Sequence, residues 1–247
     1  MYKRQILEVK GLTKTFTRTN SQGKKEAFYA LNNLSFDLKK GQSLGIIGKN
    51  GSGKSTLLNI LSNIIRPSDG EVLVRGKVLS ILDIGTGMHP DLSGKENVFL
   101  RGELLGMSKQ DIEEVYSDIV GFSEIGDFID TPVKHYSSGM FLRLAFAIIV
   151  HLKADILLLD EVLSVGDLGF REKVKHALNA MSSETTLIIV SHEIHTIREF
   201  VDKILYLKSD KEMSYVFSPK IDFSFDKFAA DLSTIQSEEV KIYAAQD

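Results

Sequence analysis

Residues 48–55 read Gly48-Lys49-Asn50-Gly51-Ser52-Gly53-Lys54-Ser55. The pattern predicts a short strand before this stretch, at 43–47, and an amphipathic helix after it, at 55–65. Glycines let such a loop turn its backbone N–H groups inward, and the start of the following helix attracts anions. Lys54 supplies a compact cation for phosphate, and the Ser55 hydroxyl suits Mg²⁺. A plain glycine-rich turn is the alternative, but the strand–loop–helix order favours a site for nucleotide phosphates.

Polar side chains follow two later apolar runs. Asp160 and Glu161 come directly after the run at 156–159, and His192 follows the run at 186–190. The ends of parallel strands meet at one edge of a sheet, so these side chains should lie near the phosphate loop. Asp160 can hold Mg²⁺, Glu161 can orient or deprotonate an attacking water, and His192 can hydrogen-bond a γ-phosphate. The alternatives are an acidic start to a helix and a structural or exposed histidine.

The remaining pattern indicates an α/β fold with a helical block inserted into it. Continuous apolar runs are typical of strands buried on both faces, as in a parallel sheet. Predicted strands and helices alternate in two parts of the chain, and apolar residues recur at helical spacing in the segment between them. Predicted strands also cover 6–16 and 31–38, separated by a polar segment at 17–25 with a hairpin tip or loop at 20–23. Predicted helices cover 97–105, 108–120 and 140–152.

Composition excludes several classes of protein. The chain has 247 residues, enough for one large domain, and it contains no cysteine, which excludes disulfides, Cys-ligated zinc, iron–sulfur clusters and thiol catalysis. A formal net charge of −3 gives no general attraction to nucleic acid. The sequence has neither the roughly 20 apolar residues needed to span a bilayer nor a signal-like start. We therefore expect a soluble intracellular chain.

A third motif gives the sequence a family resemblance. Residues 136–140 read Tyr-Ser-Ser-Gly-Met and precede an apolar helix. Together with the phosphate loop and the acidic pair, this resembles the nucleotide-binding subunit of ABC transporters, and within them the polysaccharide exporters. Segments 88–97 and 160–167 are also similar to that group, and the resemblance extends over about 5–207.

The resemblance implies a fold and a domain layout. We expect a P-loop NTPase core of the RecA-like type, with an antiparallel β subdomain and an inserted α-helical subdomain. A single nucleotide-binding domain would cover 1–247, with its core at about 1–85 and 153–207. The helical subdomain would cover about 86–152, and the tail at about 208–247 stays unassigned.

The resemblance also implies roles for particular residues, with ATP and Mg²⁺ as cofactors. Glu161, His192 and Lys54 would be catalytic, while Ser55, Asp160 and, as a substitute ligand, Asp83 would hold Mg²⁺. Residues 137–139 would reach the ATP of a second copy, although a serine before a helix is also explained as a simple cap. The expected nucleotide contacts are Phe16, Gly48, Asn50, Gly51, Ser52, Gly53, Lys54, Ser55, Thr56 and, in trans, Ser137, Ser138 and Gly139.

Three features depart from the common family pattern. Ser138 and Met140 replace a glycine and a glutamine of the common signature, as is usual among the polysaccharide exporters. The glutamine that precedes the helical block in most members is absent; Asp83 is one substitute, but an ungapped comparison puts Ile84 nearer that position. Phe16 occupies the place of the aromatic residue that stacks on adenine, Tyr29 is a second candidate, and both are also explicable as core aromatics.

The expected function is that of an ATPase subunit for export of a lipid-linked polysaccharide such as O-antigen, capsule or teichoic acid. The subunit would form a homodimer on two copies of a separate transmembrane permease, peripheral to the cytoplasmic face of the inner membrane. A non-transport ABC ATPase acting on nucleic acid or ribosomes is the alternative, disfavoured by a single phosphate loop and no basic excess. A regulatory ATP-binding module and a kinase or GTPase are further alternatives. The tail is too short for the sugar-binding domain of some members, so polymer recognition is expected in the membrane partner.

Overall fold

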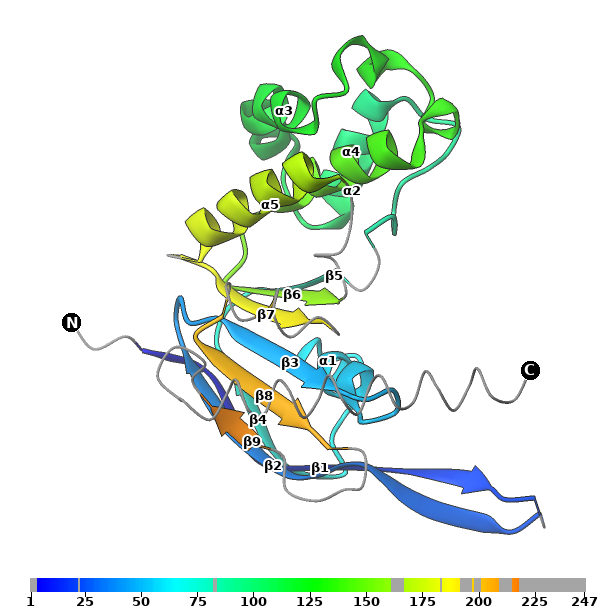
Figure 1. Ribbon diagram of the computed structural model, residues 1–247, viewed down its shortest axis with the longest axis vertical. Coiled ribbons are helices and arrows are strands. Elements are labelled where there is room, and N and C mark those ends of the chain that lie inside the picture. Colours follow the sequence, from blue (N-terminus) through cyan, green and yellow to red (C-terminus); the bar gives the residue numbers. More distant parts are fainter. Residues whose placement is uncertain are drawn as a thin grey trace.

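Two β-sheets form the frame of the molecule (Figure 1). The computed structural model describes residues 4–21, 23–81, 84–160, 167–182, 184–191, 197, 201–208 and 215–217. The smaller sheet is antiparallel, with strand order β2-β1-β4. Its strands are β1 (Gln5–Thr19), β2 (Lys25–Lys39) and β4 (Asp69–Val74).

The larger sheet has the strand order β5-β6-β7-β3-β8-β9. The first five strands are parallel to their neighbours, and β9 runs antiparallel to β8. The predicted parallel interior is confirmed, because β6 and β7 lie between other strands and their apolar residues are buried. The strands are β3 (Leu44–Gly48), β5 (Val78–Ile81), β6 (Ile156–Asp160), β7 (Thr186–Val190), β8 (Lys203–Leu207) and β9 (Tyr215–Phe217).

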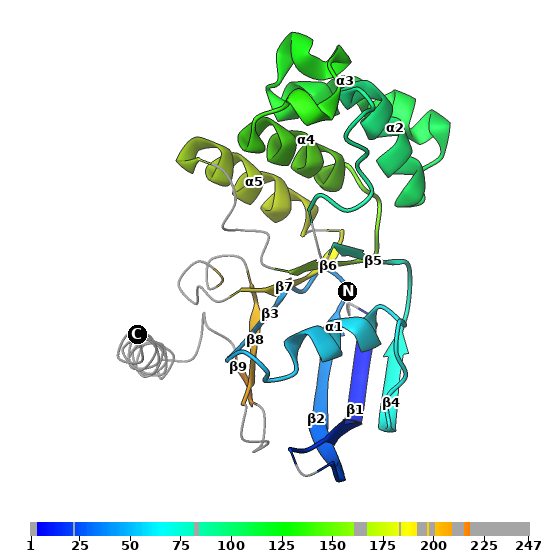
Figure 2. The same cartoon turned by 90° about the vertical axis from the view of Figure 1, so that its right-hand side faces the viewer.

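Apolar side chains cover both faces of the larger sheet. Leu158 points into a core shared with the antiparallel sheet and α1 (Lys54–Leu61). Its neighbour Leu157 points to the opposite face, which α4 (Ser138–Val150) and α5 (Leu168–Met181) cover. Figure 2 shows the resulting layers, with α4 and α5 on one side of the sheet and α1 with the antiparallel sheet on the other. The predicted α/β fold class is confirmed.

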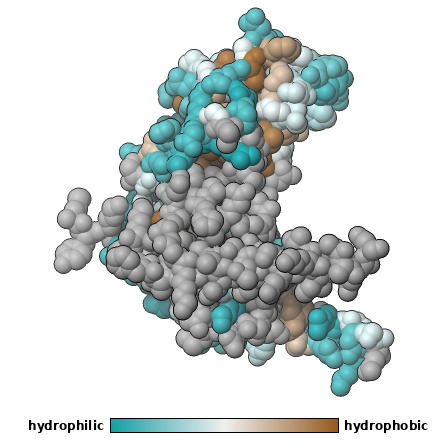
Figure 3. Space-filling model, in the orientation of Figure 1, coloured by the Kyte–Doolittle hydropathy of each residue, from teal (hydrophilic) through white to brown (hydrophobic). Residues whose placement is uncertain are grey.

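The helical block packs around a third apolar cluster. It contains α2 (Gly94–Leu104), α3 (Lys109–Ser123), two 3₁₀ turns (Gly126–Asp130 and Val133–His135) and α4. Helix α4 belongs to two layers, because Phe146 faces the sheet while Leu144 and Ile148 face α2 and α3. The face of this block in Figure 3 is mostly hydrophilic, with smaller apolar areas between.

Ser108 begins α3 as predicted. Its hydroxyl accepts a hydrogen bond from the Asp111 backbone amide, and the Asp111 carboxylate accepts one from the Ser108 amide. This reciprocal capping box satisfies two N–H groups that would otherwise lack an intrahelical partner.

The helix after the phosphate loop is shorter than its apolar spacing predicts. It ends at Leu61 rather than at 65, because Asn63 adopts the left-handed conformation with φ 58°. Ile64 is consequently 62% exposed instead of buried. No helix among the described residues is both long and apolar enough to cross a membrane. The strand and helical turn expected within 221–232 lie outside the described residues.

Candidate functional site

The loop between β3 and α1 is built closely against neighbouring backbone. Gly53 adopts φ 102°, and a methyl group at this position would meet the Ala30 carbonyl oxygen and lie 2.9 Å from Leu31 Cδ2. A methyl group on Gly48 would meet the Leu207 carbonyl oxygen at the end of β8. Only glycine fits these two places, so the loop can turn its backbone inward as the motif predicts.

Helix α1 begins without a side-chain cap. The other α-helices among the described residues each begin with a capping side chain, supplied by Ser93, Ser108, Ser137 and Asp167. The first N–H groups of a helix need partners from outside it. At α1 no capping side chain therefore competes for these donors with an anion bound in the loop.

Two buried polar side chains complete the loop. Lys54 is 9% exposed, and its Nζ donates to the carbonyl oxygens of Gly48 at 2.7 Å and Lys49 at 3.0 Å. The Ser52 hydroxyl oxygen is buried and has no hydrogen-bond partner within the described part of the chain. A buried polar group without a partner costs about 1–3 kcal/mol, so an oxyanion in the loop would relieve that cost. The loop thus fits a phosphate chain.

Strand register brings Asp160 to the same edge of the sheet as the loop. Asp160 pairs with Val190 of β7, and Val190 pairs with Ile46 of β3, two residues before Gly48. One strand separates β6 from β3, which corresponds to about 10 Å. Ser55 lies in the first turn of α1 at the same edge with an exposed side chain, and Thr56 follows it half-buried.

Three predicted residues lie outside the described part of the chain. They are Asp83, Glu161 and His192. Ile84, the alternative occupant of the position considered for Asp83, is 7% exposed and packs in the apolar core. An apolar side chain in that environment offers no ligand to a metal or to water.

The serine-glycine turn at 137–139 starts α4. The Ser137 hydroxyl accepts a hydrogen bond from the Met140 amide at 3.2 Å, so the capping role is confirmed. Ser138 is exposed, and a methyl group on Gly139 would find its nearest heavy atom 3.9 Å away. Packing within the described residues therefore does not require glycine here. Because α4 and α1 pack on opposite faces of the larger sheet, the chain does not bring this turn to its own phosphate loop (Figure 1).

The two aromatic candidates for adenine stacking lie on the antiparallel sheet, outside the core. Phe16 is 38% exposed and Tyr29 is 47% exposed. The Phe16 ring centre lies 5.9 Å from that of Phe28, and the Lys14 Nζ lies 5.1 Å from the Phe16 ring centre. Phe16 therefore keeps part of its surface accessible to a planar ligand.

Asn97 explains the segment at 88–97 structurally. Its side chain is fully buried, and its Oδ1 accepts a hydrogen bond from the His89 amide at 2.6 Å. Its Nδ2 donates to the carbonyl oxygens of His89, Leu92 and Ser93 at 2.9–3.0 Å. One side chain thus ties the loop before α2 to the helix itself.

Arg101 is a buried cation that sequence reasoning did not single out. It is 1% exposed, and its Nη1 donates to the Ala145 carbonyl oxygen on α4 at 3.3 Å. In the sequence, the only local signal of this burial is that Arg101 follows Asn97 by one helical turn, on the side of α2 that carries Val98.

A cleft of about 530 Å³ lies at the opposite edge of the larger sheet, beside the first residues of β6 and β7. Two of its lysines are engaged: Lys40 Nζ lies 3.4 Å from Asp155 Oδ1, and Lys77 Nζ donates to the Gly106 carbonyl oxygen at 3.1 Å. The cleft is separate from the phosphate loop, because the loop lies at the other edge of the sheet, where β3 ends.

A model of the ABC transporter family matches residues 31–164, more than half of the chain. The chain belongs to the ABC transporter family. The matched segment contains the phosphate loop, the serine-glycine turn and Asp160.

Several curated members of the ABC transporter family resemble the chain. It is 42% identical over 174 residues to the O-antigen export system ATP-binding protein RfbB of Myxococcus xanthus, covering 70% of this chain and 40% of the relative. It is 38% identical over 231 residues to the teichoic acids export ATP-binding protein TagH of Lactococcus lactis subsp. lactis, covering 93% and 49%. The chain thus spans less than half the length of these two relatives.

A solved ABC cassette shares the fold. The dimeric ATP-binding cassette MJ0796 bound to ADP and Pi superposes with a TM-score of 0.70 at 26% identity. The match covers 86% of this chain and 98% of the cassette chain.

Proposed function

We propose that this chain is the ATP-binding and ATP-hydrolysing subunit of an exporter that moves a lipid-linked polysaccharide, such as O-antigen, capsule or teichoic acid. It would work as a homodimer on two copies of a separate transmembrane permease, peripheral to the cytoplasmic face of the inner membrane. One observation supports the proposal: the phosphate loop and the exposed serine-glycine turn each start a helix, α1 and α4, and these helices pack on opposite faces of one sheet. The names of the relatives support the polysaccharide substrate.

The phosphate loop would bind the ATP phosphates. Its contacts would be the backbone donors at Asn50 and Gly51, the N–H groups at the start of α1, and the Lys54 ammonium. Ser55 and Asp160 would hold Mg²⁺, because a hydroxyl and a carboxylate are oxygen ligands that this ion prefers. When bound, Mg²⁺ neutralises charge on the phosphates. Phe16 would stack on the adenine through its exposed face.

Glu161 and His192 would act on the γ-phosphate end of ATP. Both follow strands whose ends share the edge of the sheet with the phosphate loop. Glu161 would orient or deprotonate the attacking water, and His192 would hydrogen-bond the γ-phosphate. Asp83 is proposed as a further polar partner of Mg²⁺ or water.

Residues 137–139 would complete the site of a second copy. Gly139 has free space around it, and the Ser138 side chain is exposed, so a phosphate on a partner chain can approach this helix start. The dimeric form of the cassette MJ0796 supports this arrangement. We further propose that the helical subdomain at about 86–152 passes motion from the dimer to the permease.

Complementation between inactive variants tests the shared site. Lys54→Ala should inactivate the phosphate loop, and Ser138→Arg should block the serine-glycine turn, so each variant alone should lose ATP hydrolysis. Mixed dimers contain one intact composite site, and mixing should therefore restore hydrolysis. Ser117→Arg, on the exposed side of α3, is the matched control and should keep the wild-type rate. Failure of the mixture to recover activity would refute the shared site.

Two further measurements address the chemistry and the substrate. Glu161→Gln should bind ATP and trap the dimer without turnover, so full hydrolysis by this variant would remove the base assignment. In cells that encode the chain, the same variant should deplete surface polysaccharide while lipid-linked polymer accumulates inside. Normal surface polymer would exclude the exporter function.

A further inference from the structure

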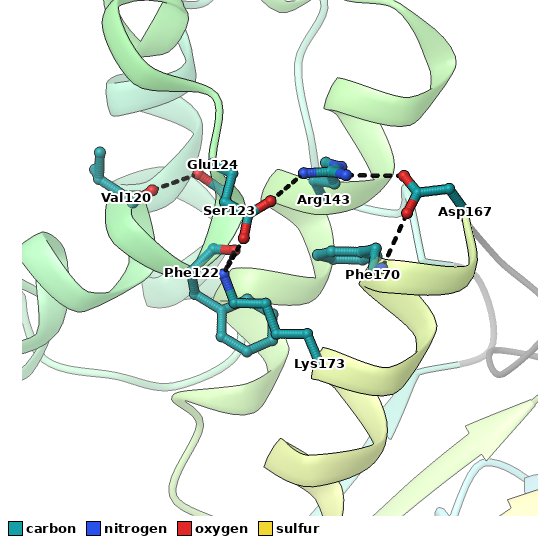
Figure 4. A network of polar contacts seen from close by, with 8 residues as sticks. All are labelled: Val120, Phe122, Ser123, Glu124, Arg143, Asp167, Phe170 and Lys173. Carbon is teal, nitrogen blue, oxygen red and sulfur yellow. Dashed lines mark hydrogen bonds and ion pairs between the residues drawn. The ribbon is translucent and has the colours of Figure 1, made fainter.

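Four charged side chains connect the end of α3 with α4 and α5 (Figure 4). Arg143 on α4 lies between two carboxylates: its Nη1 donates to Glu124 Oε2, and its Nη2 donates to Asp167 Oδ2 at 2.8 Å. Lys173 on α5 donates to the other Glu124 oxygen, Oε1, at 2.7 Å. Glu124 thus joins the end of α3 to both α4 and α5.

Arg143 and Lys173 each also contact the face of an aromatic ring. The Arg143 guanidinium carbon lies 5.1 Å from the centre of the Phe170 ring, and the Lys173 Nζ lies 4.8 Å from that of Phe122. The two rings contact each other edge to face, with centres 5.9 Å apart. Cation–π contacts add directional attraction, so the charges have little freedom to reorient.

The backbone conformation of Glu124 indicates that glutamate is present at this position for its side chain. Glu124 ends α3 in the left-handed conformation, with φ 55° and ψ 26°. Glycine is the usual residue at such a position, and another residue costs about 1 kcal/mol or more. The chain uses glycine at a similar positive φ two residues later, at Gly126 with φ 57°. The left-handed turn therefore does not favour glutamate over glycine. Arg143 and Lys173, however, need the Glu124 carboxylate as their ion-pair partner.

Stability alone is a weak explanation for the network. The Glu124 side chain is 50% exposed and that of Asp167 is 63% exposed. Exposed ion pairs contribute about 0–1 kcal/mol each. A guanidinium held between two carboxylates is instead effective at setting orientation, because its planar fork matches their geometry.

Two residues of the network lie near the proposed functional segments in the sequence. Arg143 belongs to the helix that begins with the serine-glycine turn. Asp167 caps α5 by accepting a hydrogen bond from the Phe170 amide at 3.0 Å, and it follows Glu161 by six residues in the sequence. The ion pair between Arg143 and Asp167 thus connects the helix that presents the turn to the residue that ends the stretch containing the proposed base.

We propose that Glu124 is a positioning residue for ATP hydrolysis. It holds the Arg143 guanidinium against Asp167 and thereby fixes the start of α5 relative to the helix that carries the serine-glycine turn. This inference rests on the proposed function.

Glu124→Gly separates positioning from folding. The substitution removes the carboxylate and relieves the left-handed backbone, so the melting temperature should not fall. We expect kcat for ATP to drop by about ten-fold, because small displacements of reacting groups slow catalysis strongly. The KM for ATP should stay within about a factor of two, because the phosphate loop is untouched. Glu113→Gln is the control: Glu113 pairs with Lys109 on α3 at 3.8 Å, without a contact to α5, and hydrolysis should be unchanged.

A double-mutant cycle tests whether the effect passes through Arg143. Asp167→Asn keeps a good N-cap for α5 but removes the charge that faces Arg143. It should lower kcat by a similar factor, about ten-fold, and the double variant with Glu124→Gly should be no slower than either single variant. A double variant slowed by the product of the two effects would overturn the proposal.

Hydrogen exchange provides a measurement that does not depend on turnover. In Glu124→Gly the Phe170 amide should exchange at least about five-fold faster, because its Asp167 acceptor is less constrained, while amides at 176–181 keep their rates. Unchanged exchange at Phe170 would overturn the inference. If the wild-type chain has no ATPase activity, the proposed function is refuted instead. Wild-type turnover by Glu124→Gly overturns only the positioning role.

Discussion

Replacing Asn97 by alanine should destabilise the chain strongly. The His89 amide would lose its acceptor, Asn97 Oδ1, in a buried place, at a cost of about 1–3 kcal/mol. The three carbonyl oxygens that accept from Nδ2 each keep a second donor, namely the amides of Leu92, Val133 and Asn97 itself. Their lost bonds therefore add only about 0.5 kcal/mol each. The free energy of unfolding should fall by about 3 kcal/mol in total.

Urea unfolding of the wild-type and variant chains measures this difference. An unchanged m-value would show that the two denatured states are alike. In a thermal scan the same loss corresponds to about 6–12 °C for a domain of this size. Asn179→Ala is the control, because Asn179 is exposed on α5, and its stability should be unchanged or slightly higher.

Asn97→Asp sharpens the test. The introduced carboxyl keeps an acceptor for the His89 amide but faces three carbonyl oxygens, so burial should raise its pKa in the folded state. The unfolded state then loses its proton first, and stability should fall as the pH rises above about 4. A loss below about 1 kcal/mol for Asn97→Ala, or a pH-independent Asn97→Asp, would refute the assigned role of Asn97.

Three further outcomes follow from the structure. Gly53→Ala should weaken ATP binding at least about ten-fold in calorimetry, through a clash with backbone, whereas Gly23→Ala, left-handed but in open space, should leave binding unchanged. Burial and the nearby Asp130 charge raise the pKa of Tyr136 to about 12. The unfolded state therefore deprotonates first, and stability should fall by up to about 1.4 kcal/mol per pH unit between about pH 10 and 12, an effect that Tyr136→Phe removes. Phe16→Ala should reduce ATP affinity about ten-fold while leaving binding of inorganic triphosphate intact, and equal losses for both ligands would contradict adenine stacking.

Sequence reasoning succeeded where a structural constraint is local. The runs at 156–159 and 186–190 are continuous because both faces of β6 and β7 are buried, and the glycines at 48–53 are required within a few residues of each other. The strand β4 was not predicted, because it starts with Asp69 and Gly70, residues typical of turns, and because most of its residues are exposed.

Non-local contacts escaped prediction. Glu124, Arg143, Asp167 and Lys173 meet only because α3, α4 and α5 converge, and nothing in their spacing indicates that they form one network. The exposed Ile64 shows the reverse failure, since its apolar spacing continues a helix that the left-handed Asn63 has already ended. Local patterns thus locate the phosphate loop, while the geometry between helices has to come from packing.

The sheet that stands between α1 and α4 has a consequence for regulation (Figure 2). Within the described part of the chain, the larger sheet separates the serine-glycine turn from the molecule's own phosphate loop, so the turn is placed to contact a nucleotide on a neighbouring copy. If turnover requires this contact, the ATPase rate per molecule depends on the local concentration of copies. Dilution would then lower the ATPase rate per molecule without any inhibitor, and a higher local concentration would raise it.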